Sequence, residues 1–449
     1  MNAGVREPMF NDLRGMAVSS QSLQGVGALD HAIEGYLCMA VDTGERLKAV
    51  YAEDAQMPMA DILRGYFFML MAVPSLKAKA GQIRTGLERR WSDMTPRERM
   101  HADAMHAWTM GLTDQALGLW ETILLAHPLD ILALRLAHHG YFYRGDSQNL
   151  RDVVSRVQHA WDDQVPGYGY VEGMQAFGLE ETHAYAEAIE KGCSAVARTP
   201  KNPWAIHAVA HVYEMTDTPE EGIAWLVETE ANLSDVNNFR YHVWWHRALM
   251  HLDLGQYDKT LELYDQTIWD PVSDEYLDLC NNAALLMRLE LHGIDVGHRW
   301  QDLAEKCRHR KADCILTFID AHFALILAAV DDAATGPALD AQQEYARTNS
   351  QEDNARVASE VGVELARGLV AYQRGDYEAT IKSMLPIRYS LPGIGGSHAQ
   401  RDLFSMILLD ATLREGRTEL ARSLAAERRG RQPTNSWSKL AYDRAMALT

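Results

Sequence analysis

Two pairs of histidines stand out in this 449-residue chain because the members of each pair are four residues apart. His207 and His211 form the first pair, and His242 and His246 form the second. On a helix, residues four apart project from one face, so each pair would present two imidazoles to the same space. Glu214 extends the first stripe with a carboxylate. Imidazole and carboxylate together suit acid–base chemistry, and we predict that these five residues are catalytic.

The same residues could hold a metal ion. Histidine pairs one turn apart, with a carboxylate nearby, can supply ligands to Zn²⁺ or Fe²⁺. Glu214 does not lie between two histidines, as the general base of an HExxH motif does. Two alternatives therefore stay open: a divalent metal bound by the four histidines, or metal-free chemistry in which Glu214 orients one of them. The sequence itself requires no cofactor.

Repeated helical hairpins are the elements that would position these side chains. Aromatic-rich segments, glycine-containing turns and amphipathic segments recur along the chain, and the first turn spacings are 34 and 33 residues. The predicted turns lie at Gly111, Gly145, Gly178, Asp217, Gly255 and Gly375. This period is typical of the tetratricopeptide unit. We predict an all-α, tetratricopeptide-like solenoid, curled around a central cavity, and no sheet, because no segment shows strand alternation with hairpin turns.

The chain divides into four predicted parts. Residues 1–20 form a weakly structured arm, and residues 21–98 form N-terminal capping helices. Residues 99–270 contain the repeats with the histidine-rich inner face, and residues 271–449 contain divergent repeats and a C-terminal cap. Each repeat contacts mainly its neighbours, so these parts are subregions rather than independent domains.

Composition excludes several classes of partner. The chain has 43 Lys and Arg against 62 Asp and Glu, a net charge of −19, which argues against binding to nucleic acid or to anionic membranes. Five cysteines without CxxC spacing favour reduced thiols. We see no signal peptide, and the apolar run at 315–330 is too short to cross a membrane. The sequence therefore predicts a cytoplasmic protein with no nucleic-acid or membrane partner.

Several segments resemble the tetratricopeptide repeat protein 38 family, including "RERMHADA", "WAIHAVAHVYEM", "HVWWHRALMHLDLGQYD" and "LPIRYSLPGIGGSHAQRDLF". The resemblance runs from about residue 30 to the end of the chain. It implies a shared polar site but no particular reaction. Beyond the five residues above, the positions that match the family pattern, and that we predict to bind substrate, are His101, His138, Trp245, Asp320, His322, Arg388, Arg401 and Asp402.

These observations lead to two functional hypotheses. The first is a histidine- and aromatic-lined pocket that binds a small polar molecule and catalyses hydrolysis or another proton transfer, with Arg401 holding a substrate anion. The rival is a non-enzymatic scaffold that binds a protein or peptide. Assembly into a homodimer stays open under both. The first hypothesis requires the chain to curl until Arg401 approaches the four histidines.

Overall fold

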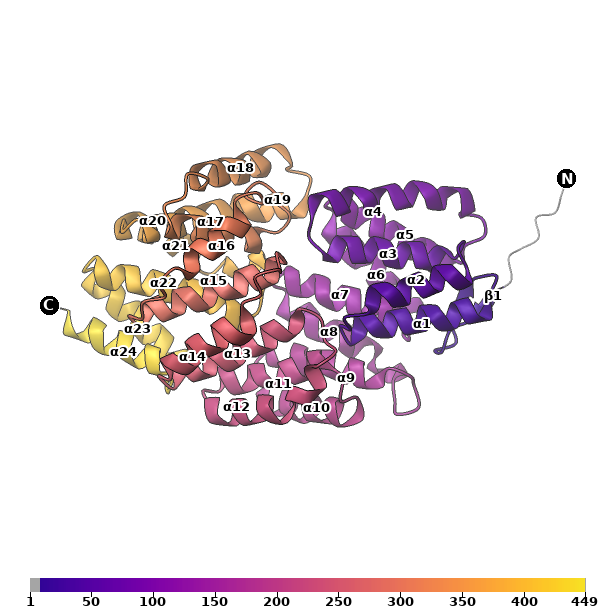
Figure 1. Ribbon diagram of the computed structural model, residues 1–449, viewed down its shortest axis with the longest axis horizontal. Coiled ribbons are helices and arrows are strands. Elements are labelled where there is room, and N and C mark those ends of the chain that lie inside the picture. Colours follow the sequence, from indigo (N-terminus) through magenta and orange to yellow (C-terminus); the bar gives the residue numbers. More distant parts are fainter. Residues whose placement is uncertain (1–8, 449) are drawn as a thin grey trace.

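The computed structural model describes residues 9–448, and helices make up nearly all of its regular structure (Figure 1). The predicted all-α fold is confirmed. A short antiparallel hairpin of β1 (Met9–Asn11) and β2 (Ala17–Ser19) is the exception, so the prediction of no sheet is wrong at this point. The hairpin also replaces most of the predicted loose arm, whose residues 1–8 lie outside the described part of the chain. Three-residue strands are too short to show alternation, which explains the missed sheet.

Four helices precede the regular repeats: α1 (Leu23–Leu37), α2 (Thr43–Glu53), α3 (Pro58–Leu70) and α4 (Pro74–Leu87). Five helix pairs follow, and their first helices begin at residues 96, 131, 168, 203 and 239, which are 35 to 37 residues apart. The pairs are α5 (Pro96–Thr109) and α6 (Thr113–Ala126), α7 (Ile131–Tyr143) and α8 (Ser147–Val157), α9 (Tyr168–Glu180) and α10 (Tyr185–Arg198), α11 (Pro203–Met215) and α12 (Pro219–Glu228), and α13 (Phe239–Asp253) and α14 (Tyr257–Leu263).

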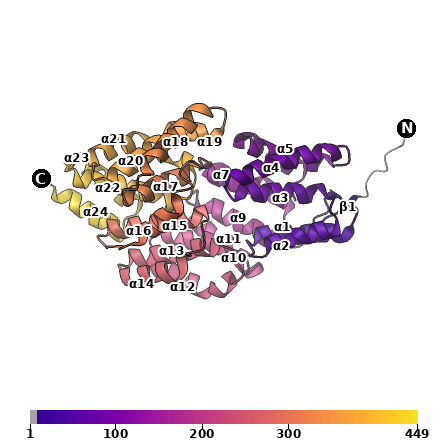
Figure 2. The same ribbon diagram turned by 45° about the horizontal axis from the view of Figure 1, so that its top comes forward.

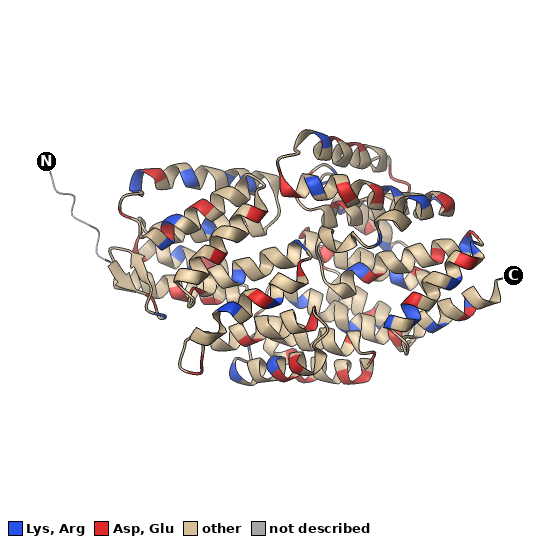
Figure 3. Cartoon of the chain, turned by 180° about the vertical axis from the view of Figure 1, so that it is seen from behind, with Lys and Arg blue, Asp and Glu red and all other residues tan. Residues whose placement is uncertain are grey.

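Less regular pairs complete the chain: α15 (Tyr276–Leu291), α16 (Arg299–Cys307), α17 (Thr317–Ala329), α18 (Thr335–Thr348), α19 (Asp353–Val357), α20 (Val363–Gln373), α21 (Tyr377–Ile387), α22 (His398–Arg414), α23 (Thr418–Arg431) and α24 (Ser436–Ala447). None of the helices in residues 9–448 has both the length and the hydropathy of a membrane span. Acidic and basic residues are interspersed along the ribbon, and no large stretch of it carries basic residues alone (Figure 3).

First and second helices of a pair are buried differently, and this difference positions the histidines. In α8 the buried residues are Leu150, Val153, Val154 and Val157, a single apolar stripe that faces its partner helix. In α11, by contrast, ten consecutive residues from Pro203 to Val212 are buried. First helices are enclosed by their own partner and by neighbouring repeats, so a polar side chain on them is held inside the protein.

The turns between helices follow the sequence prediction at five of the six predicted positions. Gly111, Gly145, Gly255 and Gly375 have positive φ, as does Asp217. Gly178 is different, because it lies inside α9 rather than at a turn. A Cβ at Gly178 would lie 2.6 Å from the Cα of Arg151 on α8, so this glycine permits close helix packing.

Contacts between distant parts of the chain curl the solenoid. The backbone N–H of Asp353 donates to the carbonyl of Gly111 at 3.0 Å, which brings α19 beside the N-terminal helices (Figures 1 and 2). The segment before α22 contacts the end of α7, where a Cβ at Gly395 would lie 2.5 Å from the carbonyl oxygen of Tyr143. Helix α22 in turn packs against α11 and α15. The C-terminal helices therefore lie next to the repeats that carry the paired histidines.

Candidate functional site

The four paired histidines form one buried cluster. Helices α11 and α13 pack side by side, so the stripe of His207 and His211 faces the stripe of His242 and His246. The Nε2 atom of His242 lies 2.9 Å from Nε2 of His207 and 3.3 Å from Nε2 of His246. Each of the four residues offers a nitrogen within 4.8 Å of the other three, and the side chains are 0 to 3% exposed. We call these four residues the histidine cluster.

The spacing of the histidine cluster fits a metal ion. Two nitrogens bound to one tetrahedral ion at ~2.05 Å lie ~3.3 Å from each other, close to the separations observed here. Burial lowers the pKa of His207, His242 and His246 well below the ordinary imidazole value. Three of the four rings are therefore neutral at pH 7, and neutral imidazole is the form that binds metals.

Two carboxylates contact the histidine cluster, each through a different histidine. Glu214 lies with its Oε2 atom 2.6 Å from Nδ1 of His246. Glu180, the last residue of α9, lies with its Oε2 atom 3.5 Å from Nδ1 of His211. A carboxylate that accepts the Nδ1–H of a histidine directs the Nε2 lone pair outward, as in carboxylate–histidine–metal arrangements. Glu214 was predicted from its spacing to the first histidine pair, whereas Glu180 has no such signal in the sequence.

The pKa values of this region follow from burial and close pairing. Burial raises the pKa of Glu214 to about 7. Burial lowers the pKa of His211, but the adjacent Glu180 carboxylate outweighs burial and leaves that pKa above its ordinary value. Burial raises the pKa of Glu180 in spite of its imidazole neighbour. The Glu180 carboxylate therefore favours the protonated form of the His211 ring.

Several polar atoms around the centre lack hydrogen-bond partners among residues 9–448. They include Nδ1 of His207, Nδ1 of His242, both ring nitrogens of His211 and both carboxylate oxygens of Glu180. Buried polar groups are rarely left unsatisfied, because each one loses its hydrogen bonds to water. A cation at the centre of the histidine cluster would provide a partner for a ring nitrogen and a counter-charge for Glu180.

Aromatic rings enclose the histidine cluster. Trp245 stacks on His242 with ring centroids 5.4 Å apart and an interplanar angle of 15°. Phe177 lies 5.3 Å from both His207 and His211, and Trp204 lies 5.2 Å from His207. The aromatic residues Tyr213, Tyr241 and Trp244, on the same two helices, make no ring contact with the cluster in the described structure, whereas Phe177 and Phe239 do. These rings pack directly against the four histidines.

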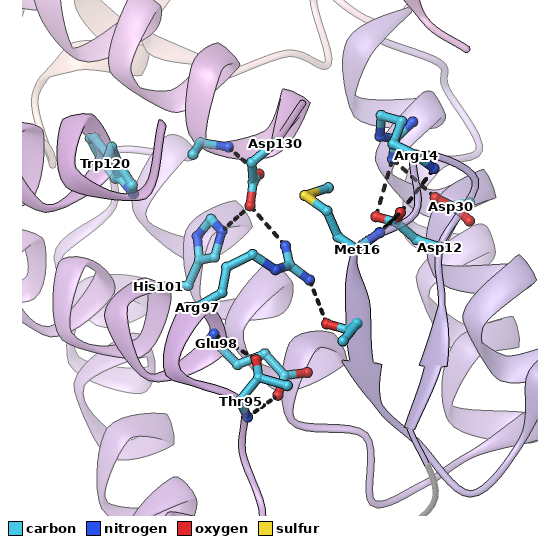
Figure 4. A network of polar contacts seen from close by, with 12 residues as sticks. Asp12, Arg14, Met16, Asp30, Thr95, Arg97, Glu98, His101, Trp120 and Asp130 are labelled. Atoms are coloured by element: carbon cyan, nitrogen blue, oxygen red, sulfur yellow. Dashed lines mark hydrogen bonds and ion pairs between the residues drawn. The ribbon is translucent and has the colours of Figure 1, made fainter. Parts of the chain in front are cut away.

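Two of the predicted substrate-binding histidines have hydrogen-bond partners outside the histidine cluster. His101 lies with Nε2 3.0 Å from Oδ2 of Asp130, and the same oxygen accepts a 2.8 Å hydrogen bond from Arg97 (Figure 4). Asp130 also caps α7 by accepting from the N–H of Ala133. His138 lies with Nε2 3.1 Å from the carbonyl oxygen of Met174. The structure brings neither His101 nor His138 into the histidine cluster.

Asp320 and His322 lie on α17, away from the histidine cluster. His322 has Nδ1 2.8 Å from the carbonyl oxygen of Phe318 on the preceding turn, and its ring contacts Phe404 at 5.4 Å. Burial raises the pKa of Asp320 to about 8. The contacts of His322 are those of a core residue.

Arg401 approaches the histidine cluster through an intermediate carboxylate. Glu181 has its Oε2 atom 3.7 Å from the Arg401 guanidinium, and its Oε1 accepts a 3.0 Å hydrogen bond from the N–H of His398. The anion beside Arg401 is therefore the carboxylate of Glu181, in the place where the sequence predicted a substrate anion. Asp402 pairs with Arg428 at 2.6 and 2.8 Å rather than with the adjacent Arg401.

A small polar cavity of about 30 Å³ lies behind Glu214, and its lining includes Asp253 and Arg288. Burial, with a contribution from Glu214, raises the pKa of Asp253 to about 7. The folded protein therefore retains a proton on Asp253 that the unfolded chain loses above pH ~4. Between pH 4 and 7, this group makes the protein less stable as the pH rises.

We expect Asp253→Asn to change the melting temperature in a pH-dependent way. The substitution keeps an oxygen that can accept the 3.0 Å hydrogen bond from Asn435 and removes the ionisation. The difference in melting temperature, variant minus wild type, should be larger at pH 8 than at pH 5. Thermal melts at both pH values test this, with the exposed Asp258→Asn as control. A difference between Asp253→Asn and wild type that is constant over this range would contradict the assigned cause.

Comparison with known proteins adds only distant similarities. No family model matches the chain, so the resemblance to the tetratricopeptide repeat protein 38 family stays a prediction. The chain is similar to a Rap protein complexed with competence and sporulation factor (TM-score 0.44, 14% identity, 79% of this chain and 100% of that one). Further similarities are to the human IFIT1 dimer with m7Gppp-AAAA (0.40, 12%, 96% and 91%) and to yeast Tom70 (0.34, 12%, 94% and 96%). At these scores the fold assignment rests on the helix pairs of the chain itself.

Proposed function

We propose that this chain is a tetratricopeptide-like scaffold that binds one divalent transition-metal ion between α11 and α13. The observation that carries the proposal is the convergence of four buried ring nitrogens to within 4.8 Å of one another. Glu180 and Glu214 supply two carboxylates next to the four imidazoles, and together they would balance the charge of a divalent ion. Nitrogen ligands in this number favour Zn²⁺, with Fe²⁺ as the other candidate.

Burial supports a structural role for the ion rather than a catalytic one. Catalytic metal sites keep a position open for water or substrate, whereas structural sites are closed by four protein ligands. The four side chains are at most 3% exposed and are surrounded by aromatic rings. The scaffold hypothesis is therefore better supported than catalysis by these histidines. The ion would tie the fourth regular helix pair to the fifth and keep the curled shape in which the scaffold meets its partner.

Metal analysis of the purified protein tests the proposal. We expect about one zinc or iron ion per chain in the wild type and a substoichiometric amount in His242→Ala and His246→Ala, because each loses one of four ligands. His138→Ala is the matched control, since it removes a buried histidine from another first helix and should keep the metal. Wild-type protein that stays free of metal after dialysis against zinc and iron salts would refute the proposal.

A further inference from the structure

A second site lies where the C-terminal helices meet the turn between α9 and α10. A cavity of about 500 Å³ opens there between His183, Tyr185, the end of α21, the start of α22 and the end of α23. We call it the seam cavity, because its walls come from segments that are some 200 residues apart. Its volume lies in the range of small-molecule sites, about 300–1,000 Å³.

The lining of the seam cavity is basic in an otherwise acidic protein. The chain as a whole has a net charge of −19. The lining of the seam cavity nevertheless includes only one carboxylate, that of Asp402, together with four guanidiniums and two imidazoles. These basic groups are Arg388, Arg401, Arg428, Arg431, His183 and His398. An excess of guanidinium groups over carboxylates in a cavity lining favours a ligand with negative charge.

Three of the four arginines already have a carboxylate partner. Arg388 donates to Glu427 at 2.9 and 3.2 Å, Arg428 is paired with Asp402, and Arg401 is paired with Glu181. These pairs hold the cavity walls in place.

Arg431 differs from these three, because among the described residues it interacts electrostatically only with Asp402, a carboxylate that Arg428 already binds. Arg431 is exposed, and the same lining contains His183 and His398, whose ring centroids are 5.0 Å apart. His398 also lies with Nδ1 3.0 Å from Oε2 of Glu181. Two tyrosines add flat surface to this polar wall. Tyr389 is 77% exposed, and its hydroxyl accepts a hydrogen bond from Arg388.

We propose that the seam cavity binds a small organic molecule through a phosphate or carboxylate group. Arg431 would bind the anionic group, His183 and His398 would line the same cavity, and the tyrosines would contact the body of the molecule. A fork of N–H donors matches both kinds of anion, and hydrogen bonds to charged groups are the stronger ones. This site is distinct from the histidine cluster and does not depend on the bound metal.

Titration calorimetry on the full-length protein tests this proposal. The probes are inorganic pyrophosphate and succinate, at equal ionic strength in chloride, so that phosphate and carboxylate recognition are distinguished. We expect saturable binding of at least one probe and a loss of roughly 10-fold or more in affinity for Arg431→Gln. Arg429→Gln is the control, because it removes the same charge from the same helix but its side chain lies over the ring of Tyr442, outside the cavity.

The outcomes are distinct. Binding that is weakened by Arg431→Gln and unaffected by Arg429→Gln supports the seam cavity as an anion site. Absence of saturable binding of both probes, or equal weakening in the two variants, overturns it. The metal content of Arg431→Gln should equal that of wild type, so a failure here is separate from a failure of the proposed metal site.

Discussion

Chelation is expected to lower the melting temperature of the wild-type protein and to leave that of His211→Ala nearly unchanged. The proposed ligands come together only in the folded chain, because α11 and α13 are separate helices. An ion that binds only the folded state at a free concentration 1,000 times its dissociation constant stabilises that state by about 4 kcal/mol. Without the ion, His211 would also be the only positive partner of the Glu180 carboxylate among the four histidines.

Differential scanning calorimetry with and without chelator, followed by addition of zinc, measures this effect. His251→Ala is the control, because this histidine lies on α13 and contacts Gln256 rather than the histidine cluster. It should respond to chelator as wild type does. Helical content from circular dichroism shows whether His211→Ala is folded. A wild-type melting temperature that is insensitive to both chelator and zinc would argue against metal-dependent stability.

Asp130→Asn should produce the second large effect, a loss of about 3–5 kcal/mol in the free energy of unfolding. Asp130 is 1% exposed and contacts both Arg97 and His101 (Figure 4). The substitution preserves the cap of α7, because Asn is also a good N-cap, but it leaves the buried Arg97 guanidinium without a counter-charge. Denaturant unfolding of the variant measures the loss.

The effect of Asp130→Asn should depend on pH. Burial raises the pKa of Asp130, but His101 and Arg97 outweigh burial and hold that pKa far below its ordinary value. The ionised group therefore stabilises the fold above pH ~4, and this contribution is lost as the pH falls further. The double variant Arg97→Met with Asp130→Asn should recover part of the stability, because no unpaired charge remains. A double variant as unstable as the sum of the two single variants would count against the pairing.

The sequence was most informative where a local rule decides the structure. Turns with positive φ favour glycine, so Gly145 and Gly375 marked real turns. Gly178 was misleading, since a glycine that permits close packing of two helices has no local signature. The histidine cluster was predicted only in part. A spacing of four residues shows that two side chains share a helix face, but it does not show which carboxylate a neighbouring repeat supplies.

Contacts between distant repeats account for most of what was missed. Glu180 and Glu181 end α9, and nothing in their immediate sequence indicates that they meet His211 and Arg401. Arg401 and Asp402 are adjacent in sequence, so their side chains point about 100° apart on α22. Each pairs with a residue of another element, Arg401 with Glu181 and Asp402 with Arg428. The residues that match the family pattern do not all line one pocket in the described structure. The structure places these residues in several separate environments.

The hydrogen bond between Glu181 and the start of α22 has a consequence for the order of events during synthesis. The partners of this bond are separated by 217 residues. At a synthesis rate of 5–20 residues per second, Glu181 is synthesised roughly 10 to 40 s before His398, whose backbone N–H donates to it. In that interval the helix pairs around α9 and α11 exist without their closing segment, and Glu181 is exposed to water. A nascent chain arrested before residue 398 should therefore be sensitive to protease at the α9–α10 turn, and a chain released after residue 414 should resist.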